Sequence, residues 1–266
     1  MSSYPIRSFI KAPEGYSLIS ADLSAAEAWV VAYLAADENM KKYLGLKKLH
    51  EFAASVIFDK PLDQITYMER YTGKKGNHSL NYKTSAEELV RSINKEGIIT
   101  ISVAKGKIYY AKWHTAFNVK YWWREIEDKI NRTRTITTTY GRKRVFYGII
   151  NSDLLKEATA YEPQSTVADH MNGAVHDELN IKGGLKSIYE NIILPSNNSI
   201  RMIQTAYDSI LIECPTNLCK EIGERVVKEL ERPLIVNGQS FTIPVDCDIY
   251  PERWGEGAIS LDRFTS

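Results

Sequence analysis

The sequence predicts an α+β fold that contains a sheet with carboxylates on its strands. A helical subdomain is inserted between the first strand of this sheet and its later strands. Three observations predict it. An apolar run, Tyr16–Ala21, ends at Asp22 and has the length and composition of a strand. The segment His50–Ile136 has a mostly helical pattern that is rich in Lys, Arg and aromatic residues. Farther along, two apolar runs flank Tyr207–Asp208, which is the pattern of a tight hairpin.

The first strand and the helix after it have clear local signals. The turn signal Pro13-Glu14-Gly15 precedes the strand. An alanine-rich helix is expected after Asp22, through Ala36. Ser24 followed three residues later by Glu27 has the form of a capping box. We therefore expect a strand that leads into a capped helix.

The remaining elements follow in order. Thr135–Tyr147 is rich in β-branched and aromatic residues around the basic turn Gly141–Arg144, so it predicts a hairpin. Leu154–Leu179 predicts a helix with a kink at Pro163. The last expected elements are the hairpin strands Ile200–Ala206 and Ser209–Glu213, a helix over Leu218–Leu230 and a strand over Phe241–Ile249.

Composition bounds the class of protein. A chain of 266 residues can bury a full core as one large domain or two modest ones. Its formal net charge of +1 gives no indication of a nucleic-acid partner, yet a cleft with both carboxylates and cations is compatible with it. The three cysteines form no CxxC pair and suit a reducing compartment. No signal peptide or apolar membrane span is found, so we expect a soluble protein of the cytoplasm.

Two carboxylates, Asp22 and Asp208, have similar local settings, at the end of a strand and at the tip of a hairpin. Phosphoryl transfer with two metal ions needs such a pair on rigid backbone. Taken alone, either Asp is more often a turn or helix-start residue. That these two residues bind metal ions is therefore a hypothesis, which composition cannot test.

A second candidate group is the set Arg70, Lys74, His78 and Tyr82. Steps of four residues place these side chains along one slowly drifting stripe of a helix. Two cations, an imidazole and a phenol on one face would suit a triphosphate with a base stacked beyond it. A solvated basic helix face explains the pattern equally well, since further lysines lie nearby.

A third group is aromatic: Trp113, Tyr121, Trp122 and Trp123. These side chains could form a stacking platform for a single-stranded template. At helical spacing, aromatic residues are more often the core of a subdomain, and we favour that interpretation.

Three segments resemble the motifs of family A (polymerase I-like) DNA polymerases. Asp22–Glu27 resembles motif A, DYSQIE, and Arg70–Tyr82 resembles motif B, R-x3-K-x3-(F/Y)-x3-Y. Ala206–Glu213 resembles motif C, which is usually VHDE before an apolar strand. Smaller matches in the family's order are Arg7 before Phe9, Leu49–His50, Thr139–Arg142, Pro163–Thr166 and Val245–Trp254.

The resemblance implies a right-hand polymerase fold with an antiparallel palm sheet. Residues 1–49 and 137–266 would form the palm, and 50–136 the helical fingers. The family's thumb and exonuclease domains normally precede the palm and are absent from this sequence. We therefore expect either a fragment or a separate polypeptide that supplies them.

The implied function is template-directed addition of deoxynucleotides to the 3′ end of a primer. Asp22, Asp208 and the Leu23 carbonyl would hold two Mg²⁺ ions, with Mn²⁺ as an alternative. Lys74 would protonate the leaving pyrophosphate. The implied partners are primer-template DNA and dNTPs, without a membrane, and the compartment would be a host cytoplasm if the chain is phage-encoded.

The resemblance also implies a nucleotide site and contacts with the primer-template. Glu27 would exclude a 2′-hydroxyl, and Tyr82 would lie near the base-stacking position. The nucleotide-binding residues would be Glu27, His50, Arg70, Lys74, His78 and Tyr82, and the primer-template residues would be Arg7, Arg142 and Gln164.

Four positions depart from the family pattern in a way that resembles phage members. Trp29 replaces an Arg, His78 an aromatic residue, Lys83 a Gly and Ser209 the Glu of VHDE. A single-subunit RNA polymerase shares the three motifs and often has Ser at the last of these positions, but Glu27 argues against it. A non-catalytic DNA-binding subunit is the third reading. The retained carboxylates and motif B cations argue against that one.

Overall fold

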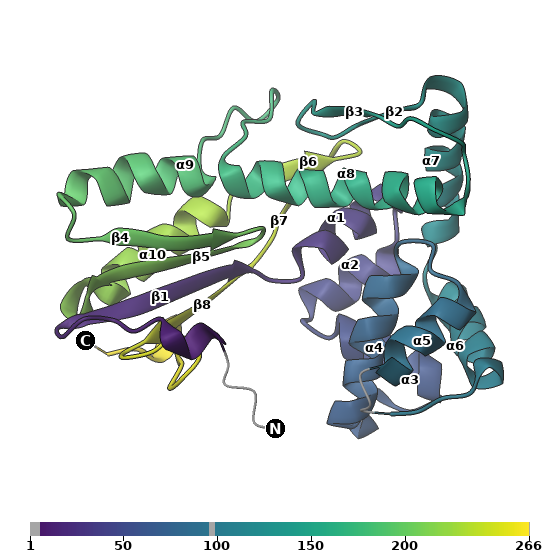
Figure 1. Ribbon diagram of the computed structural model, residues 1–266, viewed down its shortest axis with the longest axis horizontal. Helices are drawn as coiled ribbons and strands as arrows, with labels where there is room; N and C mark the ends of the chain where they lie inside the picture. Colours follow the sequence, from purple (N-terminus) through teal and green to yellow (C-terminus); the bar gives the residue numbers. More distant parts are fainter. Residues whose placement is uncertain (1–5, 96–98, 266) are drawn as a thin grey trace. The chain divides into compact units, whose positions relative to one another are not determined.

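The computed structural model describes residues 6–95 and 99–265, which form two compact units (Figure 1). The first, here called the sheet unit, consists of Met1–Ala26 and Thr166–Ser266. The second, the helical unit, is the continuous segment Glu27–Ser165. The helical unit is thus inserted after the first strand of the sheet, as the sequence predicts.

The sheet unit is built on a five-stranded antiparallel sheet with the order β4-β5-β1-β8-β9 (Figure 1). β1 is central, because it pairs with β5 on one side and β8 on the other. The strands are β1 (Tyr16–Leu23), β4 (Arg201–Ala206), β5 (Ser209–Pro215), β8 (Val245–Tyr250) and β9 (Ile259–Ser260).

The two faces of this sheet differ. One face is packed against α10 (Cys219–Leu230) and contains the fully buried Ile19 and Ile212. On the other face, Leu18, Leu211 and Tyr250 form a buried cluster near the start of β1. The same face is open where β1 ends, because Asp22 is exposed there. Because side chains alternate along each strand, one face of the sheet is buried against α10. The other face is buried near the start of β1 and exposed near its end.

Smaller elements complete the sheet unit. A two-stranded sheet pairs β6 with β7. Their bounds are β6 (Pro233–Val236) and β7 (Gln239–Thr242), and the short helix α9 spans Gly184–Ile188.

The described residues of the helical unit form seven α-helices before a short hairpin and the long helix α8, whose residues are divided between the two units. Its core includes Trp113, Trp122 and Trp123, which are all buried, whereas Tyr121 is exposed. The tryptophans are therefore core residues rather than a stacking platform. The elements are α1 (Ala26–Leu34), α2 (Glu38–Gly45), α3 (Leu49–Phe58), α4 (Tyr67–Leu80), α5 (Ala86–Lys95), α6 (Val103–Ala116), α7 (Val119–Thr133), β2 (Thr135–Thr137), β3 (Lys143–Val145) and α8 (Ser152–Asn172).

Three sequence predictions of local structure are wrong. The helix expected to reach Leu179 ends at Asn172, because Gly173 follows with a φ of 94°. The expected last strand is divided into β7 and β8, which belong to different sheets. The capping box at Ser24 does not form, because α1 begins at Ala26 after Ala25 adopts a φ of 52°.

Among the described residues, none of the helices combines the length and apolar character needed to cross a bilayer. Cys214, Cys219 and Cys247 are buried free thiols.

Candidate active site

The sheet unit brings the two predicted metal ligands into adjacent positions. Asp22 lies on β1 directly opposite Ser209, the first residue of β5, and Asp208 is the residue before it. The Leu23 amide donates a hydrogen bond to the Asp208 carbonyl, with an N–O distance of 2.9 Å. The register of β1 on β5 therefore places the backbones of these two residues next to each other, although they are far apart in the sequence.

The hairpin turn that carries Asp208 is tight. Ala206 pairs directly with Ser209, so only Tyr207 and Asp208 form the turn. Tyr207 has a φ of 44°, a left-handed conformation that costs free energy for a bulky residue. Residues in this conformation cluster at functional sites, where neighbouring contacts hold them in place. The bond from Leu23 to Asp208 is one such contact.

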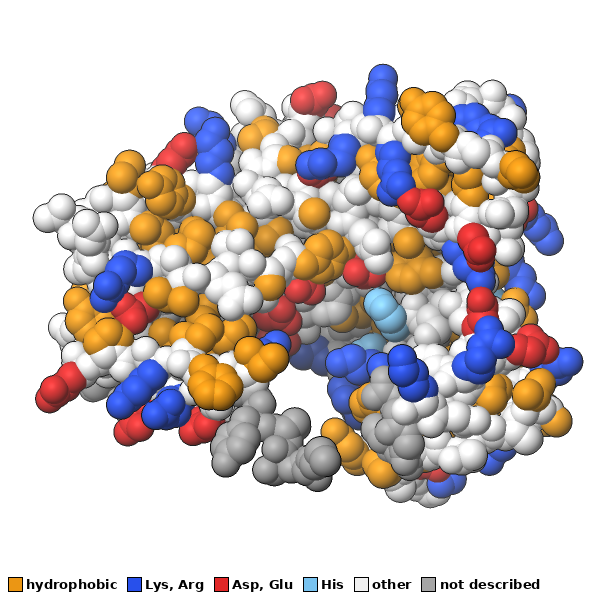
Figure 2. All heavy atoms as spheres, in the orientation of Figure 1, with side chains coloured by type: hydrophobic (Ala, Val, Ile, Leu, Met, Phe, Trp, Pro, Cys, Tyr) orange, Lys and Arg blue, Asp and Glu red, His pale blue; other side chains and the backbone are white. Residues whose placement is uncertain are grey.

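The donors at this end of the sheet suit a hard divalent cation. Carboxylate and carbonyl oxygens are the protein ligands that Mg²⁺ prefers, and substrate phosphates usually complete its shell. Within residues 6–95 and 99–265, no group of three His, Cys, Asp or Glu side chains forms a ready-made metal site. Two carboxylates with an adjacent carbonyl fit an ion that binds together with its substrate. Figure 2 shows acidic side chains gathered where β1 and its neighbours end.

A second segment has the usual sequence of motif C but does not lie at a strand. Val175–Leu179 reads Val-His-Asp-Glu-Leu and lies in turns after α8. The His176 Nδ1 atom accepts a hydrogen bond from the Glu178 amide at 3.3 Å. No strand is assigned between Gly173 and α9. The pairing of β4, β5 and β1 therefore favours Asp208 as the motif C aspartate, although the residues around it are less typical of the motif.

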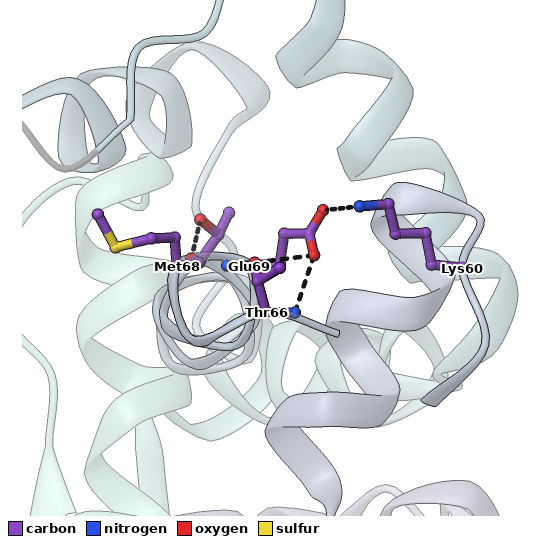
Figure 3. A network of polar contacts seen from close by, with 5 residues as sticks. Lys60, Thr66, Met68 and Glu69 are labelled. Carbon is purple, nitrogen blue, oxygen red and sulfur yellow. Dashed lines mark hydrogen bonds and ion pairs between the residues drawn. The ribbon is translucent and has the colours of Figure 1, made fainter. Parts of the chain in front are cut away.

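In the helical unit, the start of α4 is fixed by a capping box (Figure 3). The Thr66 hydroxyl accepts from the Glu69 amide at 3.3 Å, and the Glu69 carboxylate accepts from the Thr66 amide at 3.0 Å. Lys60 binds the same carboxylate at 2.5 Å. These contacts set the first turn of the helix that carries motif B.

Two glycines let α4 lie directly against α3. A Cβ atom at Gly73 would lie 2.3 Å from the His50 carbonyl oxygen and 2.9 Å from the Ala54 amide nitrogen. At Gly76 it would lie 3.4 Å from the Ile57 side chain. The glycine side of α4 therefore packs on α3, which directs the stripe of motif B away from that contact.

The motif B stripe is accessible, and Figure 2 shows Lys, Arg and His side chains over α4. Lys74 and His78 are exposed, and Arg70 and Tyr82 are partly buried. The Arg70 Nε atom lies 2.5 Å from the Glu51 carboxylate of α3. An ion pair of this kind also occurs on solvated basic helix faces.

His50 of α3 lies beside these cations. Burial, followed by the charges of Arg70 and Lys74, lowers the pKa of His50 to about 4. Its Nδ1 atom lies 3.4 Å from the Asn77 side-chain amide. The imidazole is therefore neutral near pH 7, and it can contact a phosphate as a hydrogen-bond donor rather than as a cation.

Glu27 and Tyr82 form a pair at one end of the stripe. The Tyr82 hydroxyl donates a hydrogen bond to the Glu27 carboxylate, which links α1 to the segment after α4. The His78 ring lies edge-on to Tyr82, with 5.9 Å between the ring centroids. The structure thus brings together three of the predicted nucleotide-binding residues.

The predicted primer-template residues divide between the units. Arg7 belongs to the sheet unit, where its guanidinium lies over the Trp254 ring, 4.7 Å from the centroid. Arg142 is exposed in the loop between β2 and β3, and Gln164 lies on α8 within the helical unit. Each is on the surface or partly buried, as a contact with DNA requires.

Two departures from the family pattern have local explanations. Lys83 has a φ of 59°, in the region that favours glycine, so a Gly at this position would be free of backbone strain. Its ammonium group pairs with Glu127 of α7. Trp29 is buried in α1, where its ring contributes to the core.

A comparison with models of known protein families gives a match over nearly the whole chain. The sequence model of the family described as DNA polymerase family A matches residues 2–256. The chain belongs to DNA polymerase family A. The antiparallel sheet with an inserted helical unit is the fold expected of this family's palm with inserted helical fingers.

Several relatives of this family cover most of the chain. DNA polymerase I of Aquifex aeolicus is 23% identical over 94% of the chain, and the DNA polymerase of Escherichia phage T5 is 22% identical over 91%. The match spans 41% and 31% of those two proteins. This family A chain therefore corresponds to less than half the length of these relatives.

A solved structure shows the same fold. The POL domain of Pol1 from M. smegmatis, determined in complex with DNA primer-template and dNTP, superposes with a TM-score of 0.76 at 22% identity. The superposition covers 93% of this family A chain and 42% of the other.

Sequence reasoning missed one acidic residue at the site. Asp246 lies on β8 directly opposite Asp22, on the side of β1 away from β5. The only local signal was an Asp in the alternating segment Val245–Tyr250. That signal does not reveal which residue of β1 Asp246 faces.

Proposed function

We propose that this chain is the catalytic part of a template-directed DNA polymerase, which adds deoxynucleotides to the 3′ end of a primer. The observation that carries the proposal is the register of β1 on β5. It sets Asp22 opposite Ser209 and ties Leu23 to the Asp208 carbonyl. Paired carboxylates on rigid strands are what phosphoryl transfer with two metal ions needs. The family supports the same reaction.

Asp22, Asp208 and the Leu23 carbonyl would hold two Mg²⁺ ions, or Mn²⁺ in their place. When bound, the ions stabilise charge on the attacking and leaving oxygens. The strand pairing holds these oxygen donors in position before the substrate arrives. This preorganisation reduces the rearrangement needed for the reaction.

The residues of the helical unit would bind the incoming nucleotide. In this proposal, Arg70 exchanges its contact with Glu51 for the triphosphate, and the neutral His50 donates a hydrogen bond to a phosphate oxygen. Lys74 is exposed on the same stripe and gives a proton to the leaving pyrophosphate. In these roles Arg70 and His50 bind phosphate groups and Lys74 transfers a proton, and no covalent intermediate forms on the protein.

Glu27 would select the sugar. Its carboxylate is oriented by the Tyr82 hydroxyl, so it occupies a fixed volume. A fixed carboxylate cannot donate a hydrogen bond to a 2′-hydroxyl, and it would fill the space that this group needs. His78, in contact with Tyr82, would line the same pocket.

We assign residues 1–49 and 137–266 to the palm and 50–136 to the fingers. Arg7, Arg142 and Gln164 would contact the primer-template. A separate polypeptide that supplies a thumb or an exonuclease would be a partner, and the reaction would take place in the cytoplasm, of a host cell if the chain is phage-encoded.

Primer extension tests the proposal directly. The chain is incubated with a labelled primer-template, four dNTPs and Mg²⁺. Asp22→Asn and Asp208→Asn should each lower the rate about a thousandfold, because losing a metal ligand costs several kcal/mol of transition-state stabilisation. Circular dichroism should show that both variants remain folded.

Asp63→Asn is the matched control, because Asp63 is an exposed carboxylate of the helical unit outside the site. It should extend primers at the parental rate. If either site variant also does so, the two-metal assignment is wrong. A parent chain that prefers ribonucleotides would favour the RNA polymerase alternative instead.

A further inference from the structure

Two buried cysteines lie in contact where β5 ends and α10 begins. Cys214 is on β5 and Cys219 is the first residue of α10, and both side chains are fully buried free thiols. Their Sγ atoms lie 3.0 Å apart. A disulfide bond is about 2.05 Å long, so a shift of about 1 Å would bring the two sulfur atoms to bonding distance.

The backbone already directs the two side chains toward each other. Cys214 follows Ile212 by two residues on β5, so it points to the same face of the sheet, against which α10 packs. Only Pro215–Leu218 separates the two cysteines along the chain. A disulfide between them would join the end of β5 to the start of α10.

The two sulfur atoms differ in acidity. Cys219 begins a helix, and a helix N-terminus favours a thiolate. A hydrogen bond from the Cys214 thiol lowers the pKa of Cys219, although burial opposes the shift. The same hydrogen bond, together with burial, raises the pKa of Cys214. Cys219 is therefore the better nucleophile, and Cys214 is the thiol positioned to react after it.

A hollow in the surface of the sheet unit approaches this pair. It has a volume of about 770 Å³, and its lining includes Ser17 and Thr216. The hydroxyl oxygens of these two residues lie 2.8 Å apart. Ser17 also donates a hydrogen bond to Cys219, which lowers the pKa of that thiol further. Ser17 therefore contacts both the hollow and the cysteine pair, so a small uncharged oxidant has a short route to Cys219.

We propose that Cys214 and Cys219 are a reversible oxidation site, which hydrogen peroxide or a similar small peroxide converts into a disulfide between β5 and α10. The inference goes beyond the proposed function and does not depend on it. In a reducing compartment such a disulfide would be transient, as redox-sensing disulfides are.

The reaction has two steps. The Cys219 thiolate attacks one peroxide oxygen, so an S–O bond forms, the O–O bond breaks, and the released hydroxide takes a proton to become water. Cys214 then attacks the Cys219 sulfur as a thiolate. The S–S bond forms and the S–O bond breaks, and the second hydroxide leaves as water after taking a proton. Two thiols are oxidised and one peroxide is reduced to two water molecules.

Peptide mapping of the full chain tests the proposal. The protein is treated with hydrogen peroxide, free thiols are blocked with iodoacetamide, and trypsin is added. Cys214 and Cys219 share the tryptic peptide 202–220, whereas Cys247 lies in peptide 229–253. Peptide 202–220 should lose about 2 Da and carry no label, because two hydrogen atoms are removed. Dithiothreitol before blocking should restore both labels.

Cys247 is the internal control, because it is buried in the same unit and burial raises its pKa to about 12. The two paired cysteines should lose their label at least about tenfold faster than Cys247. Cys247→Ala should leave the cross-link unchanged, and Cys219→Ala should abolish it. A labelled peptide 202–220 in the oxidised parent, or a link from either cysteine to Cys247, would overturn the inference even if no variant folds.

Thermal unfolding of the parent adds a second measurement. A cross-link restrains the unfolded chain, so the oxidised protein should unfold about 3–6 °C above the reduced protein. A lower midpoint after oxidation would show that the two residues cannot be bridged without distortion, and it would also overturn the inference. A chain that forms the cross-link but does not extend primers would contradict only the proposed function.

Discussion

The bond between Tyr82 and Glu27 gives a specific role to each side chain. The phenol donates to the carboxylate, and both residues are partly buried in the helical unit. An acceptor held in this way keeps one orientation, whereas an unattached glutamate would sample several rotamers. Sugar selection would then depend on the pair rather than on Glu27 alone.

Shortening Glu27 should relax sugar selection. Glu27→Ala removes the carboxylate and opens space at the 2′ position. We expect the ratio of kcat/KM for a ribonucleotide to that for the matching deoxyribonucleotide to rise at least about tenfold. Glu27→Gln keeps the volume and an acceptor for Tyr82, so it should largely preserve selection. Tyr82→Phe removes the donor and should give an intermediate ratio.

Glu38→Ala serves as the control, because Glu38 is an exposed acid of α2 that pairs with Lys41. Its ratio should equal that of the parent. An unchanged ratio in Glu27→Ala would exclude the steric role.

At the scale of elements, the proposed nucleotide site depends on the contact between α3 and α4. α3 carries His50 and Glu51, and α4 carries Arg70 and Lys74. Their relative position depends on Gly73, where the α3 backbone leaves no room for a side chain. A small shift of one helix would separate Arg70 from Glu51 and would change the surroundings of His50.

Gly73→Ala tests this contact. Alanine is the better helix former by about 1 kcal/mol, so propensity alone predicts stabilisation. The added methyl group would meet backbone atoms of α3, and we expect a net destabilisation of about 1–3 kcal/mol. Urea unfolding measures it, and primer extension should slow because the stripe moves relative to α3.

Gly45→Ala is the matched change in α2, where nothing lies within 4 Å of the added methyl group. Its free energy of unfolding should differ from the parent by less than about 1 kcal/mol. Equal stability of the two variants would show that α3 and α4 are not in tight contact at Gly73.

For the whole molecule, the net charge of +1 means that bulk charge contributes little attraction to DNA. The proposed binding of a primer-template would therefore depend on local groups of cations. Arg142 lies in the exposed segment Gly141–Val145, which contains three consecutive basic residues. A loop of this kind suits contact with phosphates, which carry no sequence information.

Arg142→Ala should weaken primer-template binding similarly for different DNA sequences. If Arg142 contacts one phosphate, the slope of log Kd against log salt concentration should fall by about 1. Fluorescence anisotropy over a range of NaCl concentrations measures the slope. Arg91→Ala removes an exposed Arg of α5 outside the proposed site and should leave the slope unchanged. Equal slopes for the parent, Arg142→Ala and Arg91→Ala would show that Arg142 does not contact the DNA.

Local patterns were sufficient to predict much of the molecule. Apolar or β-branched runs beside turn residues predicted β1, the β4–β5 hairpin and the β2–β3 hairpin, and a helical pattern predicted the helical insertion. The family motifs were visible because they are short and contiguous. Boundaries were less accurate where one residue decides them, as Gly173 does at the end of α8.

From the sequence alone, most of the elements, their order, the family and a shared site for Asp22 and Asp208 could be predicted. Which residue of β1 faces Asp246 became clear only from the strand pairing, which sets Asp246 of β8 opposite Asp22. The physical reason is that strand register is set by pairing between segments far apart in the chain, and a slip of one residue would turn each side chain to the other face. No local pattern contains that information.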